Sequence, residues 1–399
     1  MLEGLKVVEF ATYVAGPSAA TVMADWGADV IKVESKAGDP TRHLFAGNPR
    51  LTGNPVFEFE NRGKRSLVID ITKPEGRAAL LRVLKNADVF ITNLRPGSMV
   101  RNKLDYDSLK DELPGLIYCS VTGYGLEGDH VDRPAFDTAA LWTRAGLGAA
   151  TIPDGVAPFQ SRPGAGDAIC ALATCSAVLA AVVEKKTTGK GRLVETSLMR
   201  AGVYAIGWDM SIQLKYGRLQ TTRPRDIKPN PASNYFLTKD QRWIVVLPRG
   251  NADWIDVAAA MDRAELPKDP RFATAKDRSA NTAALLAELE AGFANFTLDE
   301  IGPRLTERDV MWAPLQTPAQ VVDDPFAQAA GCFIEVTDFT GETYLAPASP
   351  ARFPGVVDRT NVPAPPLGEH TRAILAEAGY SAAEIEAMIK QEAVTETAG

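Results

Sequence analysis

Short apolar runs alternate with amphipathic stretches through the first third of the chain. Leu5 to Phe10 and Ala28 to Glu34 have the alternation of strands, and Pro17 to Trp26 between them has the spacing of a helix. The same pattern continues in expected strands over 66–71, 89–93 and 115–121 and an expected helix over 74–86. This alternation predicts an α/β fold with a doubly wound parallel sheet and helices on both faces.

The rest of the chain is expected to be richer in helices. Helical patterns cover 137–148, 167–184, 196–214, 252–261, 281–293, 298–306 and much of 368–389, and strand-like residues occupy a hairpin over 234–246 and the stretch 336–353. Residues 216–231 are rich in Arg, Pro, Lys and Asn, a composition typical of a linker. We therefore expect a second, smaller domain beyond that stretch.

Composition and charge narrow the class of protein. The 399 residues, 45% apolar and 23% charged, suit a globular protein with two or three domains. The net charge of −7 disfavours nucleic acid and anionic membrane surfaces as partners. The apolar run Ala168 to Val183 is shorter than the roughly 20 residues that cross a bilayer, so it predicts a buried helix. The N-terminus has no signal-peptide pattern, and we expect a cytoplasmic protein.

Metal and disulfide chemistry have little support in the sequence. The cysteines, Cys119, Cys170, Cys175 and Cys332, include no CxxC pair and have apolar neighbours, which predicts reduced thiols used for packing. Only three histidines occur, and none is paired with another at ligand spacing. We therefore expect no metal site.

The sharpest local feature is the small-residue bend from Arg162 to Gly166, which leads Asp167 into the apolar run. Asp167 could be the helix N-cap, because an aspartate there accepts hydrogen bonds from N–H groups of the first turn. A carboxylate that glycines leave accessible could also act as a nucleophile toward an activated acyl group. The local pattern does not decide between these two interpretations.

Ligand-binding loops are expected at one edge of the sheet. Residues 93–97 and 123–125 directly follow predicted strands, where doubly wound proteins bind ligands. The first strand–helix turn lacks a GxGxxG fingerprint, since Gly16 is followed by Pro17, and this disfavours an NAD site. Basic residues of this domain suit a phosphate-rich ligand, although a solvated face would have the same composition. They are Lys32, Lys36, Arg62, Lys64, Arg65, Arg95 and Arg101.

Taken together, these segments resemble the family III CoA-transferases, the group that includes formyl-CoA transferase and carnitine CoA-transferase within the α-methylacyl-CoA racemase superfamily. The resemblance runs nearly from end to end. It is carried by residues 4–10, 15–17, 26–34, 61–66, 88–89, 93–97, 123–125, 166–167, 189–191, 194–195, 367–371 and 378–381. Each segment is weak alone, but their order along the chain is specific.

The resemblance implies a doubly wound large domain formed by both chain ends, a smaller central α+β domain and an interlocked homodimer. We accordingly expect residues 1–200 to form the N-terminal part of the large domain and 201–232 to form a linker. The small domain is expected over 233–328, and 329–399 is expected to return to the large domain.

Asp167 occupies the place of the family's nucleophilic aspartate. The resemblance thus implies CoA transfer from an acyl-CoA thioester to a free carboxylic acid through an aspartyl anhydride and an aspartyl-CoA thioester. Coenzyme A is then a substrate, and no tightly bound cofactor is expected. The implied CoA contacts are Val14, Ala15, Lys36, Lys64, Asn93, Leu94, Arg101, Gly123 and Tyr124. Lys64 and Arg101 are expected to meet the ADP phosphates.

Departures from the family pattern leave the identity of the acids open. Val14 replaces a glutamine, Thr122 replaces a lysine, and the segment 223–234 replaces a glycine-rich loop. The cations of that segment favour a dicarboxylic substrate, and transfer between two carboxyls of one diacid is equally allowed. These cations are Arg223, Arg225 and Lys228.

Two other functions are weighed against CoA transfer. A racemase of this superfamily needs a histidine base after the Gly-Tyr-Gly loop, and the side chain of Phe136 at that place cannot take a proton. A CoA-binding protein without catalytic activity is disfavoured by the intact Asp167.

Overall fold

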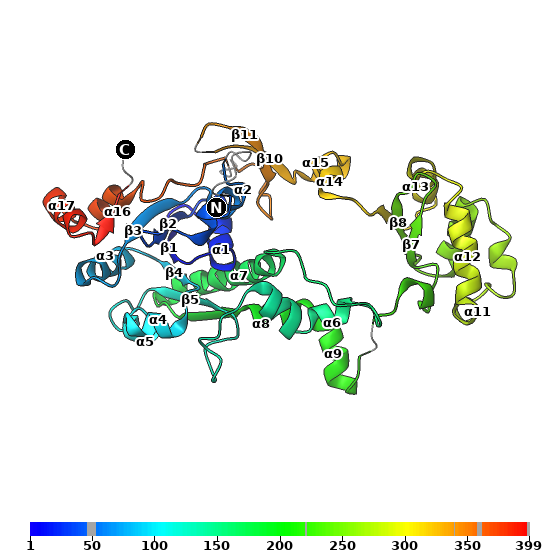
Figure 1. The fold of residues 1–399 in the computed structure, drawn as a ribbon, viewed down its shortest axis with the longest axis horizontal. Helices are drawn as coiled ribbons and strands as arrows, with labels where there is room; N and C mark the ends of the chain where they lie inside the picture. Colours follow the sequence, from blue (N-terminus) through cyan, green and yellow to red (C-terminus); the bar gives the residue numbers. More distant parts are fainter. Residues whose placement is uncertain (46–52, 220–221, 339, 357–360, 397–399) are drawn as a thin grey trace. The chain divides into compact units, whose positions relative to one another are not determined.

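A computed structural model describes residues 1–45, 53–219, 222–338, 340–356 and 361–396. The chain forms two compact units (Figure 1). The large unit comprises Met1–Ala150, Pro158–Leu219 and Gln328–Gly399, and the small unit comprises Thr151–Ala157 and Gln220–Ala327. The small domain predicted over 233–328 begins later than this unit and leaves residues 151–157 in the large domain.

The large unit is built on a seven-stranded sheet in the order β12-β3-β2-β1-β4-β5-β6. The strands are β1 Lys6–Phe10, β2 Asp29–Glu34, β3 Arg65–Ile69, β4 Val89–Thr92, β5 Ile117–Thr122, β6 Leu193–Ser197 and β12 Val394–Thr395. All neighbours pair in parallel except β12, which is antiparallel to β3. The α/β fold with a large parallel sheet is therefore confirmed. Because β1 lies between β2 and β4, the strand order reverses there and opens a crevice at the carboxyl ends of β1 and β4.

Helices cover both faces of this sheet. They are α1 Ala15–Asp25, α2 Pro55–Asn61, α3 Pro74–Leu84, α4 Pro96–Arg101, α5 Tyr106–Leu109, α6 Leu147–Thr151, α7 Ala165–Thr188, α8 Leu198–Ala205, α9 Gly207–Tyr216, α16 Thr371–Glu377 and α17 Ala382–Lys390. One core cluster joins the sheet to α3, α16 and α17, and a second joins it to α1, α7 and α8. A hairpin of β10 Phe333–Thr337 and β11 Thr343–Pro347 also belongs to this unit.

Two predicted helices are wrong in detail. The stretch 196–214 begins as strand β6, because Ser197 is extended and its hydroxyl caps α8 by accepting a hydrogen bond from the Arg200 N–H at 3.1 Å. Helices α8 and α9 follow, so most of residues 201–216, the first part of the predicted linker, is helical. The stretch 137–148 contains a π-helical segment, Thr138–Arg144, before α6 begins.

The small unit combines an antiparallel sheet with helices, as an α+β domain does. Its strands are β7 Asn234–Leu237, β8 Trp243–Val246 and β9 Trp312–Pro314, and its helices are α10 Asn251–Ala260, α11 Ala275–Ala280, α12 Thr282–Phe293, α13 Leu298–Thr306 and α14 Pro318–Val322. Helix α15, Pro325–Ala330, crosses the boundary to the large unit. Phe236 and Phe293 stack in the core with ring centroids 4.5 Å apart.

Helix α7 packs one face into the core of the large unit, as predicted for the apolar run, and leaves its other face exposed. It is long and apolar enough to cross a membrane by length and composition alone, but Cys170, Cys175 and Val178 on one face pack into the large unit. Ile169 and Leu172 on the other face are exposed. Because one of its faces packs in the protein core, the length and composition of α7 indicate a membrane span only weakly. Among the cysteines Cys332 is exposed, contrary to its predicted packing role, and the other three are buried free thiols.

Candidate active site

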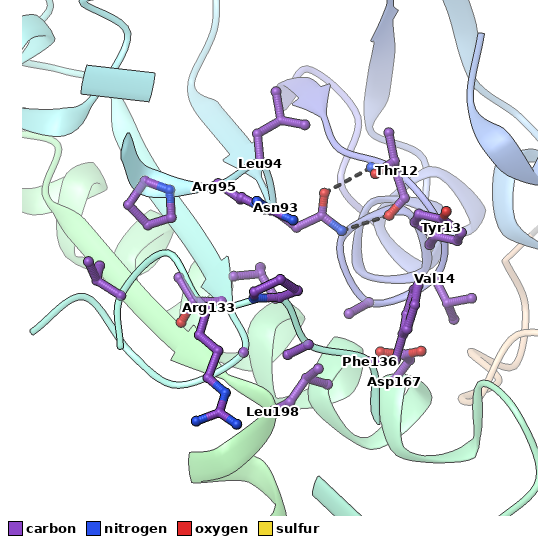
Figure 2. Close-up of a pocket in the computed structure, with 18 residues that line it drawn as sticks. Thr12, Tyr13, Val14, Asn93, Leu94, Arg95, Arg133, Phe136, Asp167 and Leu198 are labelled. Atoms are coloured by element: carbon purple, nitrogen blue, oxygen red, sulfur yellow. Dashed lines mark hydrogen bonds between the residues drawn. The ribbon is translucent and has the colours of Figure 1, made fainter. Parts of the chain in front are cut away.

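A cavity of about 420 Å³ lies at the reversal of strand order in the large unit (Figure 2). Its walls come from the β1–α1 turn, the loop after β4, the end of β5, a loop before the π-helical segment, and the first turn of α7. The lining residues are Thr12, Tyr13, Val14, Ala15, Asn93, Leu94, Arg95, Pro96, Val121, Thr122, Gly123, Val131, Arg133, Pro134, Ala135, Phe136, Asp167 and Leu198. Loops that are far apart in sequence thus meet around one carboxylate.

The first turn of this site is held by hydrogen bonds to its backbone. The side-chain amide of Asn93 donates to the Thr12 carbonyl at 2.6 Å and accepts from the Thr12 N–H at 2.9 Å, as Figure 2 shows. Tyr13 has a left-handed backbone with φ of 63°, and its N–H donates to Oδ1 of Asp39 at 3.3 Å. Because both polar atoms of its amide bond Thr12, Asn93 acts here as a clamp on the turn.

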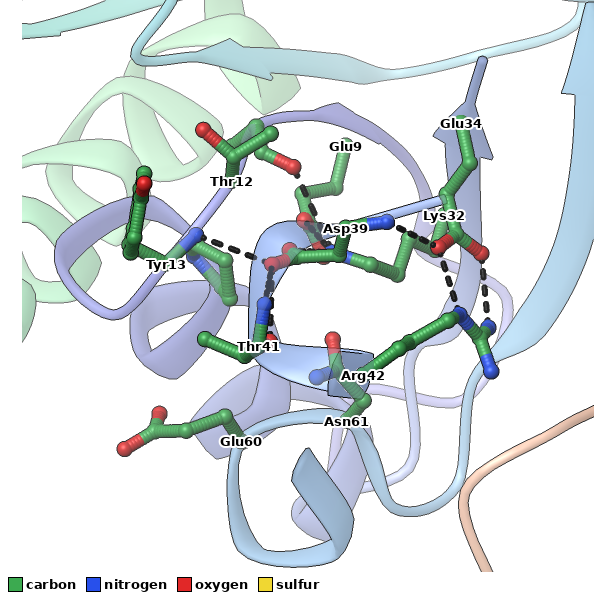
Figure 3. Close-up of polar contacts among 12 residues, drawn as sticks. Glu9, Thr12, Tyr13, Lys32, Glu34, Asp39, Thr41, Arg42, Glu60 and Asn61 are labelled. Carbon is green, nitrogen blue, oxygen red and sulfur yellow. Dashed lines mark hydrogen bonds and ion pairs between the residues drawn. The ribbon is translucent and has the colours of Figure 1, made fainter. Parts of the chain in front are cut away.

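Beneath that turn lies a buried group of charges, the Lys32 network, formed by Glu9, Lys32, Glu34, Asp39 and Arg42 (Figure 3). Lys32 Nζ lies 2.9 Å from carboxylate oxygens of both Glu9 and Asp39 and 3.3 Å from the Ala11 carbonyl. Arg42 pairs with Glu34 at 2.7 Å. The network therefore fixes the backbone that carries Tyr13.

Asp167 is the third residue of α7, not its N-cap. The cap position is Gly164, whose φ of 81° few other residues tolerate. Among the residues that the structure describes, none donates a hydrogen bond to the Asp167 side chain. The N–H of Gly166 donates to Oδ2 of Asp137 at 3.0 Å. A Cβ at Gly166 would lie 2.9 Å from the Asp137 Cβ, so only glycine allows this approach. The N-cap interpretation is therefore wrong.

Asp167, Asp137 and Glu60 form an acid cluster at the floor of the site. Burial, followed by the charges of Asp137 and Glu60, raises the pKa of Asp167 to about 7, and its exposed fraction is 9%. Burial also raises the pKa of Glu60 to about 7, against a hydrogen bond from Ser18. Within the described part of the chain, no cation pairs with the Asp167 carboxylate. At neutral pH this carboxylate is poorly solvated and unpaired, which are conditions that favour nucleophilic attack.

A second, larger cavity of about 1250 Å³ also reaches Asp167. The two cavities share Tyr13, Val14, Arg133, Phe136 and Asp167. The rings of Tyr13 and Phe136 meet edge to face, 5.2 Å apart. Asp167 and this aromatic pair thus line both cavities.

The structure brings most of the predicted contact residues together. Val14, Ala15, Asn93, Leu94, Gly123 and Asp167 line the smaller cavity, and Tyr124 lines the larger one. Lys36 and Arg101 are exposed residues of the large unit outside both linings, and Lys36 pairs with Glu392 at 3.1 Å. Their predicted contact with CoA stays a prediction.

Lys64 lies where a phosphate contact is not possible without rearrangement. Its side chain has no exposed surface, and Nζ lies 2.6 Å from Glu9 and also donates to the carbonyls of Pro17 and Glu60. Lys32 and Arg62 are likewise buried against acids. The interpretation of the basic residues as a phosphate-binding group is corrected for these three, because carboxylates of the fold neutralise them.

Several residues of the site were missed from the sequence. Glu60 had no local signal, since helix α2 lies about a hundred residues before Asp167 and reaches it only through the fold. Asp137 could have been found as an acid directly after the loop 133–136, at the start of a helical segment. Among the described residues, no group of three or more His, Cys, Asp or Glu is placed to hold a metal.

Comparison with known proteins identifies the family. The sequence profile of CoA-transferase family III matches residues 2–371. The chain belongs to this family. It is 31% identical to (R)-2-hydroxy-4-methylpentanoate CoA-transferase of Clostridioides difficile, over 96% of this chain and 97% of that one. It is 30% identical to cinnamoyl-CoA:phenyllactate CoA-transferase of Clostridium sporogenes, over 98% and 96% of the two chains.

Solved structures agree with this assignment. A CAIB/BAIF family protein from Brucella suis superposes with a TM-score of 0.83 at 32% identity, covering 94% of this chain and 99% of that chain. The predicted family and enzyme class are therefore confirmed: the protein is a CoA-transferase, acting on an acyl-CoA and a carboxylic acid.

Proposed function

We propose that this CoA-transferase works through covalent catalysis by Asp167. The observation that carries the proposal is the position of this carboxylate: it is buried, has no cation beside it within the described residues, and is reached from two cavities. One cavity can hold the thiol end of CoA while the other holds the acyl group, so that the thioester carbonyl lies at Asp167.

The reaction begins with the Asp167 carboxylate as nucleophile. An Asp167 oxygen attacks the donor thioester carbonyl, the C–S bond breaks, and an acyl-aspartyl anhydride and CoA thiolate form. The thiolate attacks the aspartyl carbonyl and releases the donor acid, leaving an aspartyl-CoA thioester. The acceptor carboxylate attacks that thioester to give a new anhydride and thiolate. Attack of the thiolate on the acceptor carbonyl then yields the new acyl-CoA and restores Asp167.

Coenzyme A enters this proposal as a substrate and not as a resident cofactor. The smaller cavity, lined by Ala15, Leu94 and Gly123, suits the narrow pantetheine arm that carries the thiol. Lys36 and Arg101 are proposed to meet the phosphates farther from Asp167. The amides at the start of α7 favour negative charge that develops on the attacked carbonyl.

The class of substrate predicted from the sequence is a dicarboxylic acid, motivated by Arg223, Arg225 and Lys228. All three belong to the small unit, where Arg225 pairs with Glu290 at 2.7 Å and donates to the Tyr235 carbonyl at 2.9 Å. That guanidinium is thus already engaged within its own unit. Intermolecular and intramolecular transfer both satisfy the chemistry of Asp167.

Trapping of the covalent intermediate tests the proposal. The protein is incubated with butyryl-CoA, reduced with borohydride and mapped by mass spectrometry. We expect reduction of one side chain, Asp167, to the alcohol only when the thioester is present. Reduction of another residue would contradict the mechanism. So would transfer activity in both wild type and Asp167→Asn without any reduced side chain.

We also propose that two copies of the chain associate in the cytoplasm. Large apolar side chains are exposed along α7, α8 and α9, among them Leu172, Val183, Tyr204 and Trp208, the last 83% exposed. Monomers rarely leave such a surface in water. Sedimentation equilibrium is expected to give the mass of a dimer, and Trp208→Glu is expected to weaken it. A wild-type mass of a single chain would exclude the dimer.

A further inference from the structure

Much of the lining of the larger cavity, which Asp167 also lines, is apolar. Helix α2 supplies part of it: the Asn54 side chain caps the helix by accepting from the Phe57 N–H at 3.0 Å, and Phe57 is buried. Val56 and Phe59 are left facing the cavity. Leu44, Pro55, Ala168 and Pro347 are further apolar residues of the lining.

These side chains are unusually exposed for their type. Leu44 is 55% exposed, Phe59 37% and Val56 36%, although all three line a concave surface. Exposed apolar area is unfavourable in water, so a ligand that covers these side chains gains free energy. The ring of Phe59 is also held in place, because the Arg62 guanidinium lies 5.2 Å from its centroid and is itself paired with Asp25.

The charges around the cavity discourage a second negative group on the ligand. Glu60, Asp137 and Asp167 all line its floor. The two lining cations, Arg133 and Arg144, lie over the ring of Tyr124, 5.9 Å and 5.6 Å from its centroid. These two guanidinium groups can bind one carboxyl or thioester group near Asp167. A second carboxylate directed toward α2 would be desolvated against Val56 and Phe59 and repelled by the acid cluster.

We propose that the site takes monocarboxylic acids with a branched aliphatic or aryl tail, and the corresponding CoA thioesters. Val56 and Phe59 are the specificity-determining residues that bind this tail. The volume of about 1250 Å³ accommodates groups much larger than acetyl. This inference rests on the proposed function, since it places the reacting carbonyl at Asp167 and the tail against α2.

A matched pair of acceptors tests the inference. In 4-methylpentanoate an isopropyl group replaces one carboxylate of succinate with nearly the same shape, so the pair differs in charge and polarity rather than size. With butyryl-CoA as the donor, we expect kcat/KM to be at least about 10-fold higher for 4-methylpentanoate than for succinate. 3-Phenylpropanoate is expected to follow 4-methylpentanoate. Equal values, or a preference for succinate, would overturn the inference.

Two variants of one residue localise the preference. Phe59→Lys places a cation on the wall and is expected to lower the 4-methylpentanoate to succinate ratio by at least about 10-fold. Phe59→Leu keeps an apolar side chain and is expected to keep the preference for 4-methylpentanoate. An unchanged ratio in folded Phe59→Lys overturns the assignment of α2 as the tail site. If that variant does not fold, the wild-type comparison still decides the class of acid.

The experiment separates this inference from the proposed function. Transfer to succinate in preference to 4-methylpentanoate, with label on Asp167, would overturn the substrate class and leave the mechanism standing. Transfer to neither acid, with no label on Asp167, would overturn both.

Discussion

Two buried groups of charged residues in the large unit have opposite properties. In the Lys32 network the carboxylates of Glu9 and Asp39 lie 2.9 Å from one ammonium group, and Figure 3 shows these contacts converging beneath the first turn. In the acid cluster, none of Glu60, Asp137 and Asp167 forms an ion pair with any residue that the structure describes. Both groups are removed from water.

Pairing rather than burial decides how these groups titrate. Burial alone would raise the pKa of Asp39, but the charge of Lys32 and hydrogen bonds from Thr41 outweigh it and lower that pKa. For Asp167, burial raises the pKa and the neighbouring acids raise it further, to about 7. The first arrangement suits a scaffold whose charges stay fixed, and the second suits a group that must react.

The largest expected effect comes from replacing the proposed nucleophile of the acid cluster. Asp167→Asn keeps the size of the side chain but cannot form the anhydride, so kcat for CoA transfer is expected to fall by at least about 10³-fold. Binding of CoA, measured by calorimetry, should change little because the cavity is unchanged. Transfer at the wild-type rate would remove Asp167 from the mechanism.

The same Asp167→Asn substitution, which lowers activity, should increase the free energy of unfolding at high pH. The folded pKa of Asp167 lies above its ordinary 3.8, so the folded state binds more protons, and the carboxylate destabilises the fold increasingly as pH rises from about 4 to 7. Asp167→Asn is expected to gain stability relative to wild type at pH 8 compared with pH 5, as measured by urea unfolding. A pH-independent difference would argue against the raised pKa.

Breaking the Lys32 network should damage the fold rather than the chemistry. Lys32→Met leaves Asp39 buried without its cation and is expected to cost about 3 kcal/mol of unfolding free energy. Lys36→Met is the matched control, because its pair with Glu392 is well exposed and should contribute little to the unfolding free energy.

The pH dependence of this loss has a defined sign. The folded pKa of Asp39 lies below its ordinary 3.8, so its ion pair contributes stability above that pH and loses it as pH falls through the folded pKa. The difference between wild type and Lys32→Met should therefore shrink in acid. An equal cost in Lys36→Met would show that the network has no special role.

The same contrast explains what could be predicted from the sequence. Strand and helix periodicity located β1 to β5, α1 and α3, and the loops after β4 and β5, because these patterns depend on neighbouring residues. Asp167 was singled out by its glycine-rich bend and by resemblance. The alternative interpretation of Asp167 as a helix N-cap is wrong, because Gly164, three residues earlier, takes the left-handed cap conformation.

Pairing between distant residues could not be predicted in this way. Lys64 and Lys36 have the same character in the sequence, yet one is buried against Glu9 and the other is exposed beside Glu392. Glu60 reaches the acid cluster only because α2 packs near α1 in the folded chain. Strand β12 has only two residues and no detectable periodicity, so its pairing with β3 is likewise a result of the tertiary fold.

A smaller expected effect concerns how the neighbouring acid Asp137 shifts the pH dependence of activity. In the proposed mechanism Asp167 must be ionised to attack, so kcat/KM is expected to rise with pH through about 7 and to be lost below it. Asp137→Asn removes a neighbouring negative charge, lowers the pKa of Asp167 and moves this limb of the profile to lower pH. The asparagine oxygen can still accept from the Gly166 N–H. Asp129→Asn, an exposed acid of the preceding loop, should leave the profile in place.

The smallest expected effect concerns cations outside both cavities. Arg101→Ala is expected to raise KM for the acyl-CoA by about 3-fold to 10-fold at low ionic strength, with kcat unchanged, if the guanidinium meets a phosphate at the surface. The effect should fade at 0.5 M salt, because exposed charges are screened over a few ångströms there.

Lys64→Met should instead lower stability, since its ammonium is paired inside the fold with Glu9. A larger salt-sensitive KM effect for Lys64→Met than for Arg101→Ala would show that the buried lysine, and not the exposed arginine, meets the nucleotide.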